Sequence, residues 1–463
     1  MQFGVVLGDD ERVMSLSTAG VAAFSGAVLF GSEIPGEYRI DRSGYEPSGA
    51  PEVVVRAVDV DDVRRAVTLA AEQGLSVVVR GAGTGLAGGA SAGAGTLVLD
   101  VSGLRRILEI STVDEWAAVE AGVSGATLDA AAGLHGLRYT PDPASIAIST
   151  IGGNIATNAG GLRCVKYGVT GDAVLGLGVV LADGSLVHTG RRTAKGVAGL
   201  DLTRLFTGSE GTLGVIVEAV VRLQPVPVQT LTVAAYFDDV EQAAAATAAV
   251  LAARVRPAML ELLDEASLRE AQDLLGVRTR SAGAFVVAQA DGFGARAEAD
   301  IISDVFRQYT SRIQVGDDAE AAAELLAIRR AALPALERHG RALIEDIAVP
   351  RSRIAEAVRR ITEVATRHHS RIYTFGHAGD GNLHPIIVVP GDDAGAAARA
   401  TAAADEIFAT ALELGGTITG EHGVGVLKRQ WLEREQGPDA LRVQRQIRRA
   451  LDPQGLFNPG KAY

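Results

Sequence analysis

The stretch RGAGTGLAGG at residues 80–89 follows an apolar run at residues 75–79 and decides how the first half of the chain is interpreted. It contains the pattern G-x-G-x-x-G, which is typical of dinucleotide-binding turns when a helix follows at once. Here a Gly/Ala/Ser tract continues to Gly95 instead. Taken alone, the pattern also fits a flexible surface loop. The sequence therefore disfavours a nicotinamide-binding Rossmann unit.

Two further glycine-rich runs lie in the same half of the chain. STIGGNIATNAGG covers residues 149–161, and GSEGTLGVI covers residues 208–216. Backbone N–H groups exposed in such loops bind anionic phosphates, and glycine lets the backbone approach a ligand closely. Three such loops together predict a phosphate-containing cofactor more strongly than one does.

The hydrophobic pattern around these runs predicts the domain organisation. Residues 1–50 carry little signal, and a short helical lead-in is expected there. Strands are predicted at residues 53–55, 75–79, 96–99, 116–120 and 174–181, and helices at residues 61–73 and 127–134. After QPVP at residues 224–227, strands and helices alternate at open spacing, which is typical of an α+β domain with one sheet. We therefore predict an α+β protein with domains at residues 1–225 and 226–415 and a C-terminal return at residues 416–463 that packs on the first domain.

Composition narrows the classes of partner. The 463 residues carry a formal charge of −12, which argues against a nucleic-acid partner. The single cysteine, Cys164, excludes an intrachain disulfide and an iron–sulfur cluster held by this chain alone. A reducing cytoplasm is therefore expected. No targeting segment or membrane-spanning run is predicted, and peripheral contact with the inner face of a membrane is left open.

The second chemical signal is FGHAGDGNLH at residues 375–384, which lies between two β-like runs. Its central glycines, Asp and Asn favour a turn, so His377 and His384 are predicted at the two sides of a hairpin. Further on, GEHG at residues 420–423 places Glu421 beside a third imidazole. Two nitrogen ligands and one oxygen ligand suit Zn²⁺ or Mn²⁺. The other histidines are expected to be ordinary core or surface residues: His135, His188, His339, His368 and His369.

Four further residues are candidates for the reaction. His422, next to the predicted ligand Glu421, suits proton abstraction, with support of the metal as the alternative. Arg329 and Arg330 follow an apolar helical stretch, and an arginine binds a carboxylate bidentately. Neighbouring helix positions diverge by about 100°, so only one of the two is expected to point inward. Asp346 is a candidate acid behind the metal, or alternatively a strand cap.

Taken together, these motifs resemble a known family. Residues 80–89, 139–145 (YTPDPAS), 152–161 and 208–214 are similar to the FAD-binding domain of the vanillyl-alcohol-oxidase-type flavoproteins. Residues 377–384, 421–423 and 457–461 (FNPGK) narrow the resemblance to the FAD-dependent D-2-hydroxyacid dehydrogenases, the group of the glycolate oxidase flavin subunits and the D-lactate dehydrogenases. The resemblance runs from about residue 50 to the C-terminus.

The resemblance implies an FAD-binding domain of two α+β subdomains and an α+β cap domain with a largely antiparallel sheet. It implies bound FAD, which is expected to be non-covalent because the first glycine loop has no His or Cys and Cys164 fits no tethering motif. The loop from Arg80 to Gly85 would wrap the pyrophosphate. The full set of implied cofactor-binding residues is Arg80, Gly81, Ala82, Gly83, Thr84, Gly85, Pro141, Asp142, Ser149, Gly152, Gly153, Asn154, Asn158, Gly160, Glu210, Ile216, Asn458 and Lys461.

The implied reaction oxidises a small 2-hydroxy acid of the D-lactate or glycolate class to the 2-oxo acid. The metal would acidify the hydroxyl, His422 would take its proton, Arg329 would bind the carboxylate, and hydride would pass to flavin N5. Ile344 stands near the position where enzymes for 2-hydroxyglutarate carry a lysine, and Leu326 where relatives often carry an aromatic residue. The uncharged Ile344 disfavours a dicarboxylic substrate.

Electrons would leave to a quinone, a cytochrome, an electron-transfer flavoprotein or an iron–sulfur subunit. Two alternatives remain open at this point. One is an FAD enzyme similar to alkyl-glycerone-phosphate synthase, and the other is a non-catalytic flavin-binding subunit of a complex. Whether the chain forms a homodimer is also left open.

Overall fold

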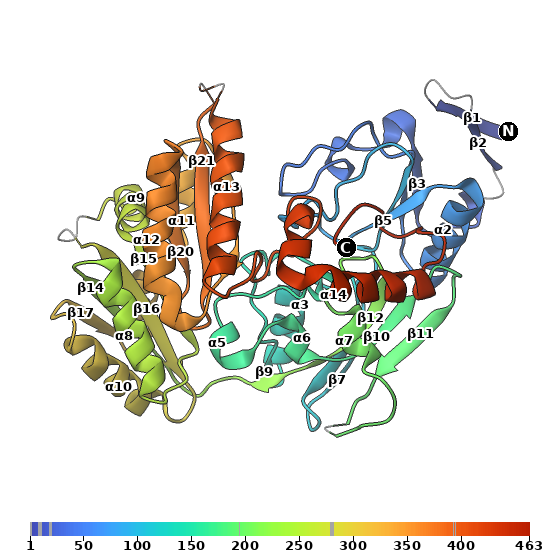
Figure 1. The fold of residues 1–463 in the computed structure, drawn as a ribbon. Coiled ribbons are helices and arrows are strands. Elements are labelled where there is room, and N and C mark those ends of the chain that lie inside the picture. Colours follow the sequence, from blue (N-terminus) through green and yellow to red (C-terminus); the bar gives the residue numbers. More distant parts are fainter. Residues whose placement is uncertain are drawn as a thin grey trace. The chain divides into compact units, whose positions relative to one another are not determined.

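A computed structural model of the chain describes residues 2–7, 12–17, 21–193, 195–277, 282–391, 393 and 395–463. The chain divides into two compact units (Figure 1). Unit 1 consists of Met1–Gly160, Val169–Val226 and Glu421–Tyr463, and unit 2 consists of Gly161–Gly168 and Pro227–Gly420. The predicted α+β class is confirmed in both units. Within the described residues, no helix is long and apolar enough to cross a membrane.

Unit 1 contains two main sheets with short helices between their strands. Its elements are β1 (Gln2–Leu7), β2 (Arg12–Ser17), β3 (Ala27–Phe30), η1 (Gly31–Glu33), η2 (Gly36–Tyr38), β4 (Val53–Arg56), α2 (Val60–Gln73), β5 (Ser76–Arg80), β6 (Thr96–Asp100), β7 (Ile107–Ser111), β8 (Trp116–Glu120), α3 (Gly125–Gly133), β9 (Leu137–Arg138), α4 (Ile151–Thr157), α6 (Thr170–Ala173), β10 (Val174–Val180), β11 (Leu186–Gly190), α7 (Leu202–Phe206), β12 (Val215–Arg222), β13 (Gln224–Pro225) and α14 (Arg429–Leu451).

The first main sheet has the order β3-β4-β6-β5, in which β4 and β5 run parallel to β6. Their valine-rich runs are typical of strands buried on both faces. Helix α2 begins where Asp59 accepts the N–H of Asp62, and it turns Val63, Ala66 and Val67 into the core at helical spacing. Strand β5 then leads directly into the glycine loop at residues 81–89, so the loop starts from a rigid edge of the sheet.

The second main sheet is antiparallel, with the order β11-β10-β12-β8-β7. Its core includes residues of α3 and α4, among them Leu128, Ile151 and Ile155. The strands and helices predicted in this half of the chain are confirmed to within a few residues. The tract that follows the first glycine loop forms no helix between residues 81 and 95, as predicted.

The C-terminal return is fixed beside β5. Helix α14 is kinked at Gly437, after which it continues to Leu451. Asp452 then accepts the N–H groups of Leu456 and Phe457 at 2.8 Å each. Phe457 is fully buried in the core of the first sheet and forms a parallel bridge with Val77. The tail that carries Asn458 and Lys461 therefore lies next to the strand that opens the glycine loop.

Two expectations for unit 1 need correction. The described part of the lead-in is mainly extended, with strands β1, β2 and β3, and it contains helical turns only at residues 21–22 and in the 3-10 helices η1 and η2. The second glycine-rich run is not wholly a loop, because residues 151–157 form helix α4. Thr150 caps that helix by accepting the N–H of Gly153, and burial of Ile151 and Ile155 outweighs the low helix propensity of glycine.

Unit 2 is built on one large sheet and its covering helices. Its elements are α5 (Cys164–Tyr167), β14 (Thr230–Phe237), α8 (Val240–Ala252), β15 (Met259–Asp264), α9 (Glu265–Leu275), β16 (Ala284–Asp291), α10 (Ala295–Arg307), β17 (Ile313–Gly316), α11 (Ala319–Glu337), β18 (Arg341–Ile344), β19 (Ile347–Ala348), η3 (Arg351–Arg353), α12 (Ile354–Arg367), β20 (Arg371–His377), β21 (Asn382–Val389) and α13 (Ala396–Glu413).

The sheet of unit 2 has the order β17-β14-β16-β15-β20-β21-β18, and β19 also pairs with β21. Every pairing is antiparallel, as predicted. One face packs against α9 and α11 through a core that includes Leu268, Ile328, Phe375 and Ile386. Alternate strand residues share a face. Residues two positions from Phe375 on β20, or two positions from Ile386 on β21, therefore also point toward α9 and α11.

Segment 161–168 belongs to unit 2 although its neighbours on both sides belong to unit 1. Within unit 2, Lys166 donates from Nζ to the carboxylate of Asp291 at 2.5 Å, and the Tyr167 hydroxyl donates to the same carboxylate at 2.7 Å. The prediction of one domain at residues 1–225 did not separate this segment from the rest.

Candidate functional site

The glycine loop after β5 has backbone N–H groups that are available to a ligand. Within the described part of the chain, no group accepts a hydrogen bond from the N–H groups of residues 81–86. The loop is held from behind by Arg80, whose Nη1 donates to the carbonyls of Ile40 and Ala90 at 3.1 and 3.2 Å. Gly83 has φ +69°, and a Cβ there would lie 2.0 Å from Arg80 Nη2. Only glycine therefore fits where the loop closes over the arginine.

A segment that sequence reasoning missed supports the other side of this loop. Asp41 is buried, and its Oδ2 accepts the N–H of Ala90 at 3.1 Å. The N–H groups of Arg42 and Ser43 donate to the carbonyls of residues 83 and 85, each at 3.1 Å. These contacts occupy the carbonyls of Gly83 and Gly85, whereas the N–H groups of residues 81–86 have no acceptor among the described residues. The only sequence signal was a lone Asp in a stretch of weak pattern.

Several buried polar atoms of unit 1 lack partners. Among the residues that the structure describes, Tyr139 Oη, Ser149 Oγ, Asn154 Nδ2 and Asn458 Oδ1 have no hydrogen-bond partner in the protein. A buried polar atom left in this state costs about 1–3 kcal/mol. Ser149, Asn154 and Asn458 were predicted to contact the cofactor. Together with the free N–H groups of the glycine loop, these atoms fit a polar ligand such as FAD.

Other predicted cofactor residues have structural partners. Asn158 ends α4 with φ 52°, and its Oδ1 accepts the N–H of Gly171 at 2.8 Å. Ile216 is buried in the core of the second sheet, and Gly152 packs against Ala121. Pro141 and Asp142, which were also predicted to contact the cofactor, lie in the loop between β9 and α4.

The third glycine-rich run holds the start of the C-terminal return. Glu210 has φ 51°, and its carboxylate accepts the N–H groups of Val424 and Gly425 at 2.8 and 2.7 Å. Its carbonyl accepts from Asn458 Nδ2 at 2.7 Å. Both carboxylate oxygens thus bind the backbone just after the predicted base, His422. Glu210 fixes the segment that carries the reactive residues.

Lys461 closes the same region. It is largely buried, and its Nζ donates to the carbonyls of Gly89 and Ser91 at 2.9 and 2.6 Å. Burial lowers the pKa of Lys461 to about 8, although Asp41 and Glu210 act in the opposite direction. The ammonium group lies next to a loop whose N–H groups are free, so this part of unit 1 is suited to an anion.

This depressed pKa predicts a pH dependence of stability. Between pH 8 and 10.5 the folded chain binds fewer protons at Lys461 than the unfolded chain does, so stability rises with pH across that window. The Lys461→Met variant cannot show this gain, which amounts to at most about 3 kcal/mol. Urea unfolding of the flavin-free wild type and variant at several pH values measures the difference. The exposed Lys195→Met serves as the matched control, and parallel curves for wild type and Lys461→Met would contradict the expectation.

Glu421 and His422 lie at the start of the return in unit 1. A Cβ on Gly160 would lie 2.3 Å from Glu421 Oε2, so the glycine makes room for this carboxylate. His422 Nε2 lies 4.0 Å from Glu421 Oε1, and the two side chains are 12% and 16% exposed. Both are therefore sheltered but reachable.

In unit 2, the predicted hairpin is confirmed. Its strands β20 and β21 extend further toward the turn than expected, so only residues 378–381 form the loop. His377 and His384 share the face that α9 and α11 cover, and their Nε2 atoms are 3.4 Å apart. Two nitrogens that each bind one metal ion at about 2.0–2.1 Å, with a tetrahedral angle between the bonds, lie roughly as far apart as these two Nε2 atoms do. The nitrogen pair fits a metal ion.

Two buried carboxylates lie behind this pair. His377 Nδ1 lies 2.7 Å from Glu261 Oε1, and Glu261 is fully buried. Asp346 is also fully buried. Its Oδ1 accepts from Asn382 at 2.6 Å and lies 3.8 Å from His384 Nδ1, and its Oδ2 accepts from Thr419 at 2.8 Å.

Of the two candidate arginines, Arg329 points inward and Arg330 is exposed. Arg329 Nε donates to Glu261 Oε2 at 2.8 Å, and its guanidinium lies 4.7 Å from the centre of the Phe375 ring. Burial by itself would raise the pKa of Glu261, but its contacts with His377 and Arg329 hold it below the usual value. The carboxylate therefore stays ionised between its two partners.

The predicted site residues are thus divided between the units. His377, His384 and Arg329 belong to unit 2, whereas Glu421, His422 and the predicted cofactor residues belong to unit 1. Among the other histidines, His339 and His368 pair with Glu270 and Glu406 at 2.7 Å, and His188 lies 3.6 Å from Glu218.

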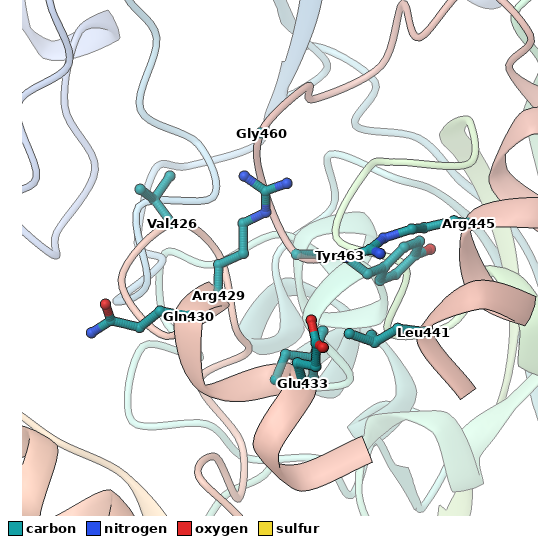
Figure 2. Close-up of a pocket in the computed structure, with 10 residues that line it drawn as sticks. Val426, Arg429, Gln430, Glu433, Leu441, Arg445, Gly460 and Tyr463 are labelled. Carbon is teal, nitrogen blue, oxygen red and sulfur yellow. The ribbon is translucent and has the colours of Figure 1, made fainter. Parts of the chain in front are cut away.

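A separate cavity of about 400 Å³ opens in unit 1 beside the kinked α14 (Figure 2). Arg429, Arg445, Glu433 and Tyr463 are among its lining residues. None of the predicted site residues lines it, so no part of the reaction is assigned to it.

Comparison with known proteins gave matches over most of the chain. The family model of the FAD binding domain matches residues 51–190, and that of the FAD linked oxidases, C-terminal domain, matches residues 226–462. Glycolate oxidase subunit GlcD of Bacillus subtilis (strain 168) is 42% identical over 419 residues, which cover 89% of each chain. D-lactate dehydrogenase of Anaerostipes hadrus is 32% identical over 447 residues, which cover 94% of each chain.

Solved structures with a similar fold have low sequence identity. A p-cresol methylhydroxylase structure has a TM-score of 0.77 at 17% identity and covers 94% of this chain and 93% of that chain. An alkyldihydroxyacetonephosphate synthase has a TM-score of 0.68 at 19% identity and covers 89% of this chain and 76% of that chain. These likenesses concern the fold alone.

Proposed function

Because this chain belongs to the FAD-linked oxidases of the vanillyl-alcohol-oxidase type, we propose that it oxidises a small 2-hydroxy acid to the 2-oxo acid. The substrate is of the D-lactate or glycolate class. The observation that carries the proposal is the polar cluster in the core of unit 2. There, His377 and His384 present Nε2 atoms 3.4 Å apart, and Arg329 lies beside them on the same Glu261 carboxylate. The glycolate oxidase subunit and the D-lactate dehydrogenase among its relatives are named for such substrates.

The oxidation removes one hydride from the α-carbon and one proton from the hydroxyl group. FAD supplies the chemistry for the first, because the flavin ring accepts a hydride. His422 takes the hydroxyl proton. Its imidazole is sheltered from solvent, and the Glu210 carboxylate fixes the backbone just after it. Arg329 binds the substrate carboxylate through its terminal nitrogens, because its Nε is already bound to Glu261.

FAD would be held without a covalent bond, by the N–H groups of residues 81–86 and the buried polar atoms of Ser149, Asn154 and Asn458. His377, His384 and Glu421 would hold a divalent ion, Zn²⁺ or Mn²⁺. Such an ion would supply Lewis acidity. Glu421 follows directly on Gly420, which packs against Asn382 and Asp346 in unit 2.

An apolar residue near the cluster favours a small substrate. Ile344 pairs in register with Ile386 and packs against the core that contains Phe375. It offers no charge to a second carboxylate, and a buried carboxylate without a partner is costly. With a single cysteine, the chain holds no iron–sulfur cluster of its own, so the electrons pass to an external acceptor. A quinone, a cytochrome, an electron-transfer flavoprotein or an iron–sulfur subunit would serve, in a reducing cytoplasm.

Anaerobic bleaching of the bound flavin tests the proposal. Glycolate or D-lactate is expected to bleach the visible absorption band, whereas L-lactate is not. D-2-hydroxyglutarate is expected to react roughly 10²-fold more slowly, because its second carboxylate finds no partner near Ile344. Stopped-flow absorbance measures these rates. If no 2-hydroxy acid bleaches the flavin, the proposal fails, and an ether-forming enzyme related to alkyldihydroxyacetonephosphate synthase becomes the better assignment.

A further inference from the structure

Glu261 has no role in the reaction as proposed above, although it is a fully buried charge with two charged or polar partners. It lies in the middle of β15, in the apolar run MLELLD, and its side chain is fully buried. The register places it directly opposite His377 on β20. A fully buried carboxylate is stable only when its charge is compensated by partners. Its two oxygens bind two different residues, His377 and Arg329.

The first contact decides which nitrogen of His377 carries a proton. A carboxylate that is paired with the Arg329 guanidinium at 2.8 Å can only accept, so Nδ1 of His377 is the donor in the 2.7 Å contact. The lone pair of the neutral ring is then on Nε2, which lies 3.4 Å from Nε2 of His384. A carboxylate behind a ligand histidine fixes the tautomer and the ring orientation in this way.

The second contact decides how Arg329 is presented. Its Nε donates to Glu261 Oε2 at 2.8 Å, while its guanidinium lies over the Phe375 ring. Two such contacts fix the plane of the guanidinium group and leave the terminal nitrogens to donate elsewhere. The carboxylate of Asp346 lies near the second histidine, with its Oδ1 3.8 Å from His384 Nδ1, and it accepts from Asn382 and Thr419.

We infer that Glu261 is a positioning residue that sets two parts of the site at once. It directs Nε2 of His377 toward the metal, and it aims Arg329 at the substrate carboxylate. The inference rests on the proposed function, because it takes the metal and the carboxylate as the ligands of these residues. It predicts that metal binding and carboxylate binding depend on one buried residue that touches neither ligand.

Glu261→Gln tests the inference, because an amide cannot satisfy both partners. If its oxygen accepts from His377, its NH₂ group faces the Arg329 guanidinium. If the oxygen accepts from Arg329, the NH₂ group faces Nδ1 of His377 and forces the ring proton onto Nε2. The first arrangement loses the hydrogen bond from Arg329, and the second loses the proton on Nδ1 of His377. Glu261→Asp keeps the charge on a shorter side chain, so it is expected to restore part of what the amide loses.

The matched control is Asp264→Asn. It makes the same acid-to-amide change in the same strand, where Asp264 accepts the N–H groups of Ser267 and Thr374. Asn caps a helix about as well as Asp does. Within the described residues, the Asp264 carboxylate shares no hydrogen bond with His377 or Arg329. It therefore reports the general effect of losing a buried charge.

The affinity for Zn²⁺ is measured on the flavin-containing protein by competition with a chromophoric chelator. The affinity for the 2-oxo acid product is measured from the flavin spectrum, and thermal unfolding with chelator present reports stability. Glu261→Gln is expected to weaken Zn²⁺ binding by about 10–100-fold, to weaken product binding, and to retain its flavin. Asp264→Asn is expected to leave both affinities unchanged.

The outcomes separate this inference from the proposed function. If wild type binds Zn²⁺ and Glu261→Gln binds both ligands within about twofold of it, the inference fails and the proposed site remains. If Asp264→Asn loses as much affinity as Glu261→Gln, the effect is structural and the inference fails. If wild type binds neither Zn²⁺ nor Mn²⁺, the proposed metal site fails and the inference fails with it. Flavin bleaching by hydroxy acids is measured separately and does not depend on this result.

Discussion

The His422→Asn variant is expected to lose turnover by about 10²–10⁴-fold while it keeps its full content of flavin. Asparagine is smaller than histidine, can still form hydrogen bonds, and cannot take a proton at neutral pH. The hydroxyl group of the substrate would then have no base. The flavin should stay, because the atoms that fit it belong to residues 81–86, Ser149, Asn154 and Asn458.

Steady-state dye reduction measures turnover, and the ratio of flavin to protein absorbance measures cofactor content. His188→Asn is the matched control. It makes the same substitution in unit 1, on a side chain in β11 that is 65% exposed. Loss of flavin together with turnover would give His422 a structural role. Turnover near the wild-type rate would remove it from the mechanism.

The His384→Ala variant is expected to lose both bound metal and turnover. It removes one of two nitrogen ligands outright, so its effect on metal affinity should exceed the roughly 10–100-fold that follows loss of a partner behind a ligand. His384 is largely buried on the sheet face covered by α11, with its ring centre 5.2 Å from that of His377. Flavin content should not change, since no predicted flavin residue belongs to unit 2.

Elemental analysis of the purified protein gives the metal content, and dialysis against a chelator followed by return of Zn²⁺ or Mn²⁺ gives the dependence of turnover on the ion. His339→Ala is the matched control, because His339 is exposed and pairs with Glu270 on the surface of unit 2. Wild-type metal content in His384→Ala would contradict the assignment. Thermal unfolding with chelator present separates loss of a ligand from loss of packing.

Local sequence patterns predicted a helix or a turn well where all residues of the stretch favour the same element. The helix predicted at residues 61–73 matches α2 (Val60–Gln73), because the buried positions Val63, Ala66 and Val67 recur at helical spacing. The turn between His377 and His384 was equally clear, because its residues favour a turn and the flanking runs favour strands. Propensity misled at α4, where a cap and two buried isoleucines fold a glycine-rich run into a helix.

The residues that sequence reasoning missed all act across long separations. Glu261 lies 116 positions before His377, and Asp41 lies 49 positions before Ala90. A single carboxylate in the apolar run of β15 was the one available signal for Glu261, because such a charge needs a buried partner. The sequence could not identify that partner, because the pairing depends on the register between β15 and β20.

Residue types alone predict the chemistry available to this protein. The order of its glycine runs, the two histidines of the hairpin and Glu421 with His422 are local features, and their turn and ligand properties follow from residue type. The fold adds which of two adjacent arginines points inward, and that one carboxylate, Glu261, contacts both Nδ1 of His377 and Nε of Arg329. A residue's type fixes which bonds it can make, but strand register and helix packing choose the partner.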